Sequence, residues 1–164
     1  VIDSGVESYT ADRLKLPQPE KLHDLVTART LSIRQCIGQF FSAFPVERIV
    51  YDLLQVEMKT PVKFEAEARS LLAWIEGVLR DCNERVDGSS LGPKFVCSVA
   101  DEGVDDPPCI QFKYDSNSFV ECFLDLDAGV AQIGAQMGDD AHSMTVAIRL
   151  LEPEEALSEA LFFG

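Results

Sequence analysis

The chain has two histidines and five cysteines, the side chains that most often serve as bases, nucleophiles and zinc ligands. His23 and Cys36 fall on one expected helix, thirteen positions apart, which separates them by roughly 20 Å at 1.5 Å per residue. His142 stands beside Ser143 in a polar turn, but sequence neighbours are poor evidence for a triad, which is defined in space. These spacings predict no nucleophile paired with a base.

Metal and phosphate motifs are also missing. The sequence has no Cys-x-x-Cys or His-x-x-x-His spacing for zinc and no glycine-rich phosphate loop. Two acidic segments, 101–106 and 125–129, lack the regular ligand spacing of a calcium loop. Carboxylates are too abundant for any pair to stand out as an acid and base. We therefore predict no catalytic, cofactor-binding or metal-binding residue, and we lean against an enzyme.

The cysteines are odd in number and widely spaced, and most fall at core-like positions of expected helices or strands. Buried free cysteine behaves as a small apolar residue. We interpret all five as reduced residues of a cytoplasmic or nuclear protein. They are Cys36, Cys82, Cys97, Cys109 and Cys122.

The formal charge of −14 is unevenly distributed. Residues 1–63 carry eight acidic and eight basic side chains, so the whole excess lies from Phe64 onward. Such a field repels phosphate backbones and anionic lipid, and it favours either a basic partner or solubility alone. No apolar run approaches the roughly 20 residues needed to cross a bilayer. We expect neither nucleic acid nor a membrane as a partner of this chain.

The strongest structural signal is alternation with period two between Lys94 and Leu151, which predicts strands joined by short turns. The turn formers at 115–118, 127–129 and 138–140 separate the later strands. All pairings would then be local and antiparallel. One face, with Gln111, Lys113 and Gln132, should stay in water. The expected strands are 94–100, 110–115, 119–126, 131–137 and 144–151.

Helical periodicity marks the rest of the chain. A first helix is expected from Glu20 to Phe44; Arg29 and Gly38 interrupt its apolar pattern but do not end it, whereas Pro45 does. A short second helix follows at 46–54, although a strand remains possible there. Thr60 and the proline after it predict the start of a long helix that ends near Gly88.

We therefore predict the α+β class, with two or three N-terminal helices packed on an antiparallel meander of about five strands and a short C-terminal helix. Residues 1–19 would form an extended arm. Residues 20–164 would form a single domain, helical over 20–87, a β-meander over 94–151 and helical again over 153–163. Because the first residue is Val1 rather than methionine, we expect a fragment of a larger intracellular protein.

Two places are candidates for partner binding. Trp74 lies at the edge of the long helix's apolar stripe, and the small residues Ser70 and Gly77 would leave a notch beside its ring. An aromatic residue in such a notch is typical of an interface, although Trp74 could instead close the rim of the core. Phe162 and Phe163 end the chain, and they either pack on the domain, which we prefer, or contact another chain.

Three functions remain open. The first is a non-enzymatic interaction or scaffold domain that docks a partner protein, or a second copy as a homodimer, through its apolar edges. The second is a small-molecule-binding or enzymatic domain with a cavity between helices and sheet, into which His142, Tyr114 or Arg149 would point. The third is an acidic, chaperone-like adaptor for a basic partner, whose binding would weaken steeply with salt.

Overall fold

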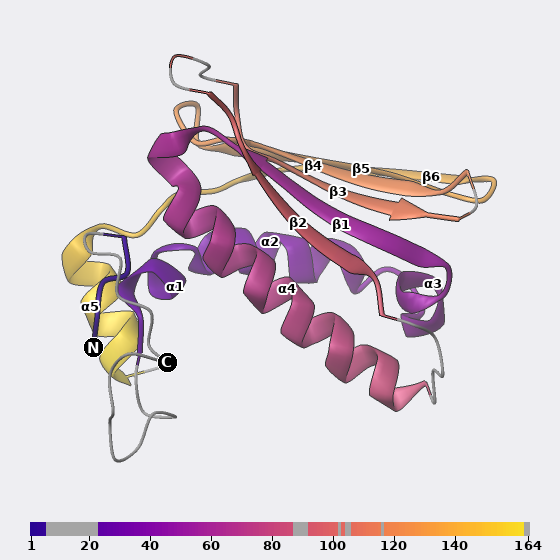
Figure 1. The fold of residues 1–164 in the computed structure, drawn as a ribbon, viewed down its shortest axis with the longest axis horizontal. Helices are drawn as coiled ribbons and strands as arrows, with labels where there is room; N and C mark the ends of the chain where they lie inside the picture. Colours follow the sequence, from indigo (N-terminus) through magenta and orange to yellow (C-terminus); the bar gives the residue numbers. More distant parts are fainter. Residues whose placement is uncertain (6–22, 87–91, 102, 104–105, 116, 163–164) are drawn as a thin grey trace.

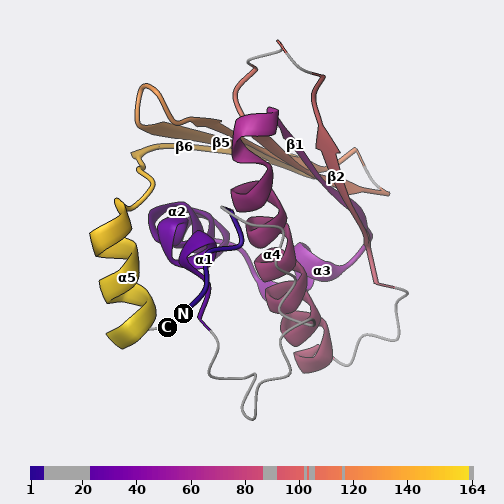
Figure 2. The ribbon, with the colours of Figure 1, turned by 60° about the vertical axis from the view of Figure 1, so that its left-hand side comes forward.

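The computed structural model describes residues 1–5, 23–86, 92–101, 103, 106–115 and 117–162. A six-stranded sheet forms one layer, and helices cover one of its two faces (Figures 1 and 2). The predicted α+β class, with N-terminal helices, a mostly antiparallel sheet and a short C-terminal helix, is confirmed. The helices are α1 Leu25–Arg29, α2 Leu31–Phe41, α3 Val46–Val50, the 3₁₀ turn η3 Val62–Phe64, α4 Glu65–Arg85 and α5 Pro153–Phe162. The strands are β1 Leu53–Thr60, β2 Lys94–Val99, β3 Cys109–Tyr114, β4 Phe119–Asp125, β5 Val130–Met137 and β6 Asp140–Ala147.

Strand β1 is the element that the prediction did not place: a short helix was expected at 46–54, with a strand as the alternative, and Thr60 as the cap of the next helix. Its alternation is nevertheless present in the sequence: Val56 and Met58 are buried in the core, while Glu57 and Lys59 point to the opposite face. Thr60 is the buried last residue of β1 rather than a helix N-cap. The helix that follows begins only after η3.

The order of the strands is β2-β1-β3-β4-β5-β6, so the predicted simple meander is wrong at its start. Helix α4 crosses over from β1 and returns the chain as β2, which pairs parallel with β1 at the edge of the sheet. Strand β3 then takes the other side of β1. The strands expected at 94–100 and 110–115 as neighbours, which correspond to β2 and β3, are therefore separated by β1. From β3 to β6 the pairing is antiparallel and local, as predicted.

The first helix is also broken, contrary to the prediction of one helix over 20–44. Helix α1 ends at Thr30, whose buried hydroxyl donates to the carbonyl of Thr27 (2.9 Å), and α2 starts at the next residue. The break frees the carbonyl of Arg29 to accept from the backbone N–H of Leu151 (3.0 Å). The chain after β6 is thereby attached to the N-terminal helices.

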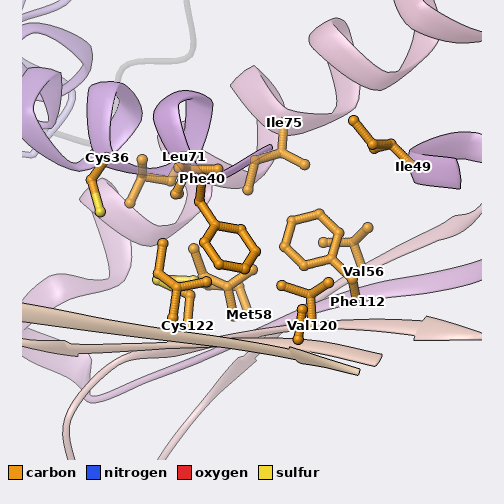
Figure 3. Close-up of a cluster of buried hydrophobic side chains, with 14 of the residues drawn as sticks. Cys36, Phe40, Ile49, Val56, Met58, Leu71, Ile75, Phe112, Val120 and Cys122 are labelled. Atoms are coloured by element: carbon orange, nitrogen blue, oxygen red, sulfur yellow. The ribbon is translucent and has the colours of Figure 1, made fainter. Parts of the chain in front are cut away.

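The core lies between the sheet and the helices α2 and α4 (Figure 3). Phe40 of α2 and Ile75 of α4 point down to the sheet, where Phe112 of β3 and Val120 of β4 point up at them. The ring of Phe41 stands edge-on to that of Phe112, with centroids 5.0 Å apart. Each large side chain buried in this way contributes roughly 1.5–3 kcal/mol. Covering one face of the sheet is therefore the main source of stability.

The C-terminal part differs from the prediction in two details. Strand β6 spans 140–147, so it begins and ends four residues earlier than the strand expected at 144–151. Helix α5 packs on α1 through Ala156 and Ala160, whereas Leu157 is exposed. Phe162 is 75% exposed, so the preferred packing of this ring on the domain is wrong. Phe163, like residues 6–19 of the expected arm and the expected helix stop at Gly88, lies outside the described residues.

Replacing either of two glycines by alanine should change the stability of the protein in opposite directions. In the middle of α2, a Cβ on Gly38 would meet no atom within 4 Å, so Gly38→Ala should stabilise the protein by about 0.5–1 kcal/mol through helix propensity. Gly129 has φ +67° and its Cβ would lie 3.3 Å from the carbonyl oxygen of Ile148, so Gly129→Ala should destabilise it by about 1 kcal/mol or more. Urea unfolding followed by circular dichroism measures both. Equal effects would contradict the conformations described for the two sites.

Candidate functional site

One face of the sheet is covered by no described element, and we call it the open face (Figures 1 and 2). The strand register arranges its outward side chains in three rows, each running across all six strands. The first row is Ser98, Lys59, Cys109, Phe123, Gln132, Thr145; the second is Val96, Glu57, Gln111, Glu121, Gly134, Ser143; the third is Lys94, Gln55, Lys113, Phe119, Gln136, Ala141.

The half of the open face on β4, β5 and β6 carries few charges, and Asp125 lies at its end, in a partial outward row with Val130 and Ala147. Phe119 and Phe123 are 43% and 44% exposed, and the neighbouring positions on β5 and β6 carry amide, hydroxyl or small side chains. In these three rows Glu121 is the single charged residue of this half. Gly134 of β5 has no side chain, and a Cβ there would meet nothing within 4 Å, so the surface is low at this position. Two exposed rings beside a low, uncharged area are typical of an interaction surface.

The other half, on β2, β1 and β3, carries three lysines and Glu57, and both carboxylates of the three rows have partners. Lys113 Nζ lies 2.6 Å from Glu57 Oε2, and Gln111 Nε2 donates to Glu121 Oε1 across the strands (2.8 Å). The Lys113 hydrogen bond, supported by Ser98, holds the pKa of Glu57 below its ordinary value. The three rows contain three lysines and two glutamates, a balance of +1 in a chain of −14. The open face is thus a nearly neutral region on an acidic protein.

A hollow of about 480 Å³ lies at one end of the open face. Phe123 and Lys59 line it from the sheet, and Ala100 and Pro107 from the chain between β2 and β3. Cys109 at its floor is buried, and burial raises the pKa of its thiol to about 11. The thiol is therefore protonated at neutral pH and is a poor nucleophile. The hollow is suited to receive an apolar group rather than to perform thiol chemistry.

A second hollow, the helix groove, opens between α2, α3 and α4 on the opposite side of the sheet. Its volume is about 220 Å³, and Phe41, Trp74 and Val78 form its walls, with Phe112 of β3 at its floor. Its lining contains no acid and no base. Gly38 also borders it, with open space where a side chain would stand.

The structure brings together only part of the predicted partner site. Trp74 is half-buried, packs against the core and lines the helix groove. Ser70 instead lies 2.8 Å from the hydroxyl of Thr27, and neither it nor Gly77 lines the groove. Phe162 is exposed at the end of α5.

The residues proposed to point into a cavity do not line the helix groove. Tyr114 donates its hydroxyl to the carbonyl of Ile49 (3.1 Å), and burial raises its pKa. Arg149 is paired with Glu155. The ring of His142 packs against Phe44, and because successive residues of a strand face opposite ways, Ser143 lies on the open face. His142 and Ser143 therefore cannot act as a catalytic pair.

The acidic segments meet at a third hollow, which Asp106, Asp125 and Asp127 line together with Lys63. The carboxylate of Asp125 accepts the backbone N–H of Ala128 (2.8 Å) and so stabilises the turn. Within the described part of the chain, no three histidine, cysteine or acidic side chains are arranged to hold a metal ion. None of the described helices is long and apolar enough to cross a membrane.

No family model, curated protein or solved structure matches this chain. The candidate site is therefore described from geometry alone. It is the uncovered face of the sheet in an α+β fold whose other sheet face lies under helices. Gln111, Lys113 and Gln132 lie on the solvent-exposed face, as predicted from their alternation. Phe119 and Phe123 were not among the predicted site residues, although their alternation with Val120 and Cys122 places them on the same face.

The pair of Glu57 and Lys113 should make stability depend on pH. The pKa of the Glu57 carboxyl is lower in the folded state than its unfolded value of about 4.5. Above pH 4.5 this difference stabilises the folded state, and the stabilisation is lost as the pH falls through the folded-state pKa. Lys113→Met should therefore cost up to about 1 kcal/mol at pH 7 and less near pH 3. Urea unfolding at both pH values measures the difference. Lys94→Met, on the same face, is the control and should show no such pH dependence.

Proposed function

We propose that this chain is a non-enzymatic interaction domain that binds a folded protein through the open face. The observation that carries the proposal is the pair of exposed rings, Phe119 and Phe123, on a sheet face that no described element covers. A sheet normally buries an apolar face against another layer. Here the layer of helices lies on the other side, so a partner would supply the second cover.

The character of the described reactive groups supports a binding role. Burial raises the pKa of the Cys36, Cys109 and Cys122 thiols, which keeps them protonated and unreactive. The helix groove has an apolar lining without acids or bases, and the hollow beside Phe123 is mainly apolar, with Lys59 and Asp106 as its charged lining residues. Recognition by surface burial needs none of these groups.

The chemistry of the open face also defines its partner. A face with a balance of +1 and uncharged residues over β5 and β6 is complementary to a neutral, partly apolar surface, and its binding should tolerate salt. The acidic adaptor would bind a basic partner elsewhere on the chain, and steep weakening with salt would favour that alternative.

Photo-cross-linking tests the proposal. A benzoylphenylalanine in place of Phe123, in cells that express the chain, should give protein adducts of discrete mass, because the ring is buried by the partner. Tyr51 is the matched control: it is an aromatic residue of similar exposure, 48%, that lies before β1 and outside the open face. Adducts are read by gel mobility and mass spectrometry. Equal labelling at positions 123 and 51, or none at either, would refute the open face as a binding surface.

The helix groove favours a second candidate function, binding of a small neutral apolar molecule. Its volume of 220 Å³ exceeds that of the cavities of about 150 Å³ that bind benzene. Because the lining is uncharged, a charged ligand would lose its hydration without gaining an opposite charge. The groove is therefore suited to a neutral ligand. Gly38 costs α2 stability and leaves the groove open where another residue would narrow it.

Trp74 reports on this candidate because it is the only tryptophan in the sequence. Benzyl alcohol should change its fluorescence in a saturable way, whereas benzoate, the same ring with a carboxylate, should not. Gly38→Leu, which fills the groove, should abolish the response. A response to benzoate, or one that survives Gly38→Leu, would exclude the groove as a site for neutral ligands.

A further inference from the structure

We propose that the partner of the open face is a second copy of this chain, packed face to face about a two-fold axis that runs parallel to the strands between β3 and β4. The inference rests on the proposed function, since it names the occupant of the same surface. In this arrangement β3 of one copy lies over β4 of the second, β1 over β5, and β2 over β6. All six strands are covered.

Charge favours this surface for self-association. The three rows carry a balance of +1, so the rest of the chain carries −15. Two copies that approach by most other surfaces bring acids against acids, and like charges in a contact are repulsive. The open face is where two acidic chains can meet with little repulsion.

The two halves of the face complement each other across the proposed axis. The half on β2, β1 and β3 carries long side chains, among them Lys59, Glu57 and Gln55. Rotation sets these opposite Gln132, Gly134 and Gln136 of β5 in the second copy. The carboxylate of Glu57 then lies over the low position at Gly134, where a Cβ would meet nothing within 4 Å. Long side chains thus meet small or uncharged ones.

The central strands match row by row. Phe123 of one copy faces Cys109 of the second and the hollow of about 480 Å³ beside it. Phe119 faces Lys113, a contact in which an ammonium group can lie on an aromatic ring. Glu121 faces Gln111, which is the residue type that already donates to it within one copy.

The two-fold axis perpendicular to the strands is disfavoured. It would set the central row against itself and place Glu121 opposite Glu121 of the second copy in a contact that excludes water. Like charges directly opposed there cost several kcal/mol. The axis along the strands avoids this pairing and buries Glu57 with its partner, since Lys113 Nζ already lies 2.6 Å from it.

The face is large enough for a stable dimer. Six strands spaced by about 4.8 Å, with outward rows spanning about six residues at 3.3 Å each, give roughly 600 Å² in projection. Stable interfaces bury about 800 Å² of accessible surface per partner, and side chains raise the accessible area above the projected one. The open face therefore provides about the area required.

Sedimentation velocity on the purified chain gives the first test. At micromolar concentration the main species should have about twice the 18.1 kDa mass of one chain. Phe123→Lys should raise the dissociation constant at least about tenfold, because it places an extra charge at the centre of the contact. Phe162→Lys, at an exposed ring outside the face, should leave the dimer intact. Circular dichroism and urea unfolding must show both variants folded. A wild-type monomer at 100 µM, or a dimer broken equally by both variants, overturns the proposal.

Isotope mixing tests the arrangement and separates it from the proposed function. Chains with benzoylphenylalanine at position 123 are mixed with ¹⁵N-labelled chains and irradiated. The ¹⁵N peptides joined to position 123 should contain Cys109 or Lys59, because β3 and β1 of the second copy lie opposite. Adducts of ¹⁵N peptides from α5 or α4 overturn the face-to-face arrangement. If Phe123 in cells instead labels only a different protein, the second copy is excluded while the interaction function stands.

Discussion

Burial of one face of the sheet under α2 and α4 is the interaction on which the rest of the structure depends. Phe112, Val56 and Val120 are fully or almost fully buried there, against Phe40 and Ile75 of the helices. The crossover from β1 through α4 to β2 places α4 on this face, and the local strand pairs that follow extend the same sheet. Because both long helices lie on one side, the other side is left without a layer of its own.

The two faces of the sheet therefore differ in character: apolar side chains are buried on the helix side, and polar and charged side chains lie on the open face. The helix side contains the large core, whereas the open face combines paired charges on β1 and β3 with an uncharged area on β5 and β6. The acidic excess lies elsewhere on the molecule. A protein of −14 with one nearly neutral sheet face has a defined place where contact costs little electrostatic energy. That property links the fold to the binding role proposed for it.

The cysteines illustrate how the same packing limits chemistry. Cys36 and Cys122 are buried between helix and sheet, and Cys109 lies under the chain that follows β2. Desolvation raises the pKa of each thiol, so burial that stabilises the fold also suppresses thiolate formation. The helix groove lies at the edge of the same core, where Gly38 of α2 leaves open space beside Trp74 and Val78 of α4.

The sequence by itself determined the α+β class, the outward and inward positions of β3, β4 and β5, the helix that begins at Pro153, and the apolar stripe of α4. These features depend on local periodicity and on backbone chemistry at single residues. Tertiary structure alone decided that β2 pairs with β1, that the first helix breaks at Thr30, and that Phe162 stays exposed. Periodicity shows which side chains share a face, but two faces of one strand look alike until distant segments cover one of them. Which face stays open, and hence why Phe119 and Phe123 are exposed, was decided by where α2 and α4 pack.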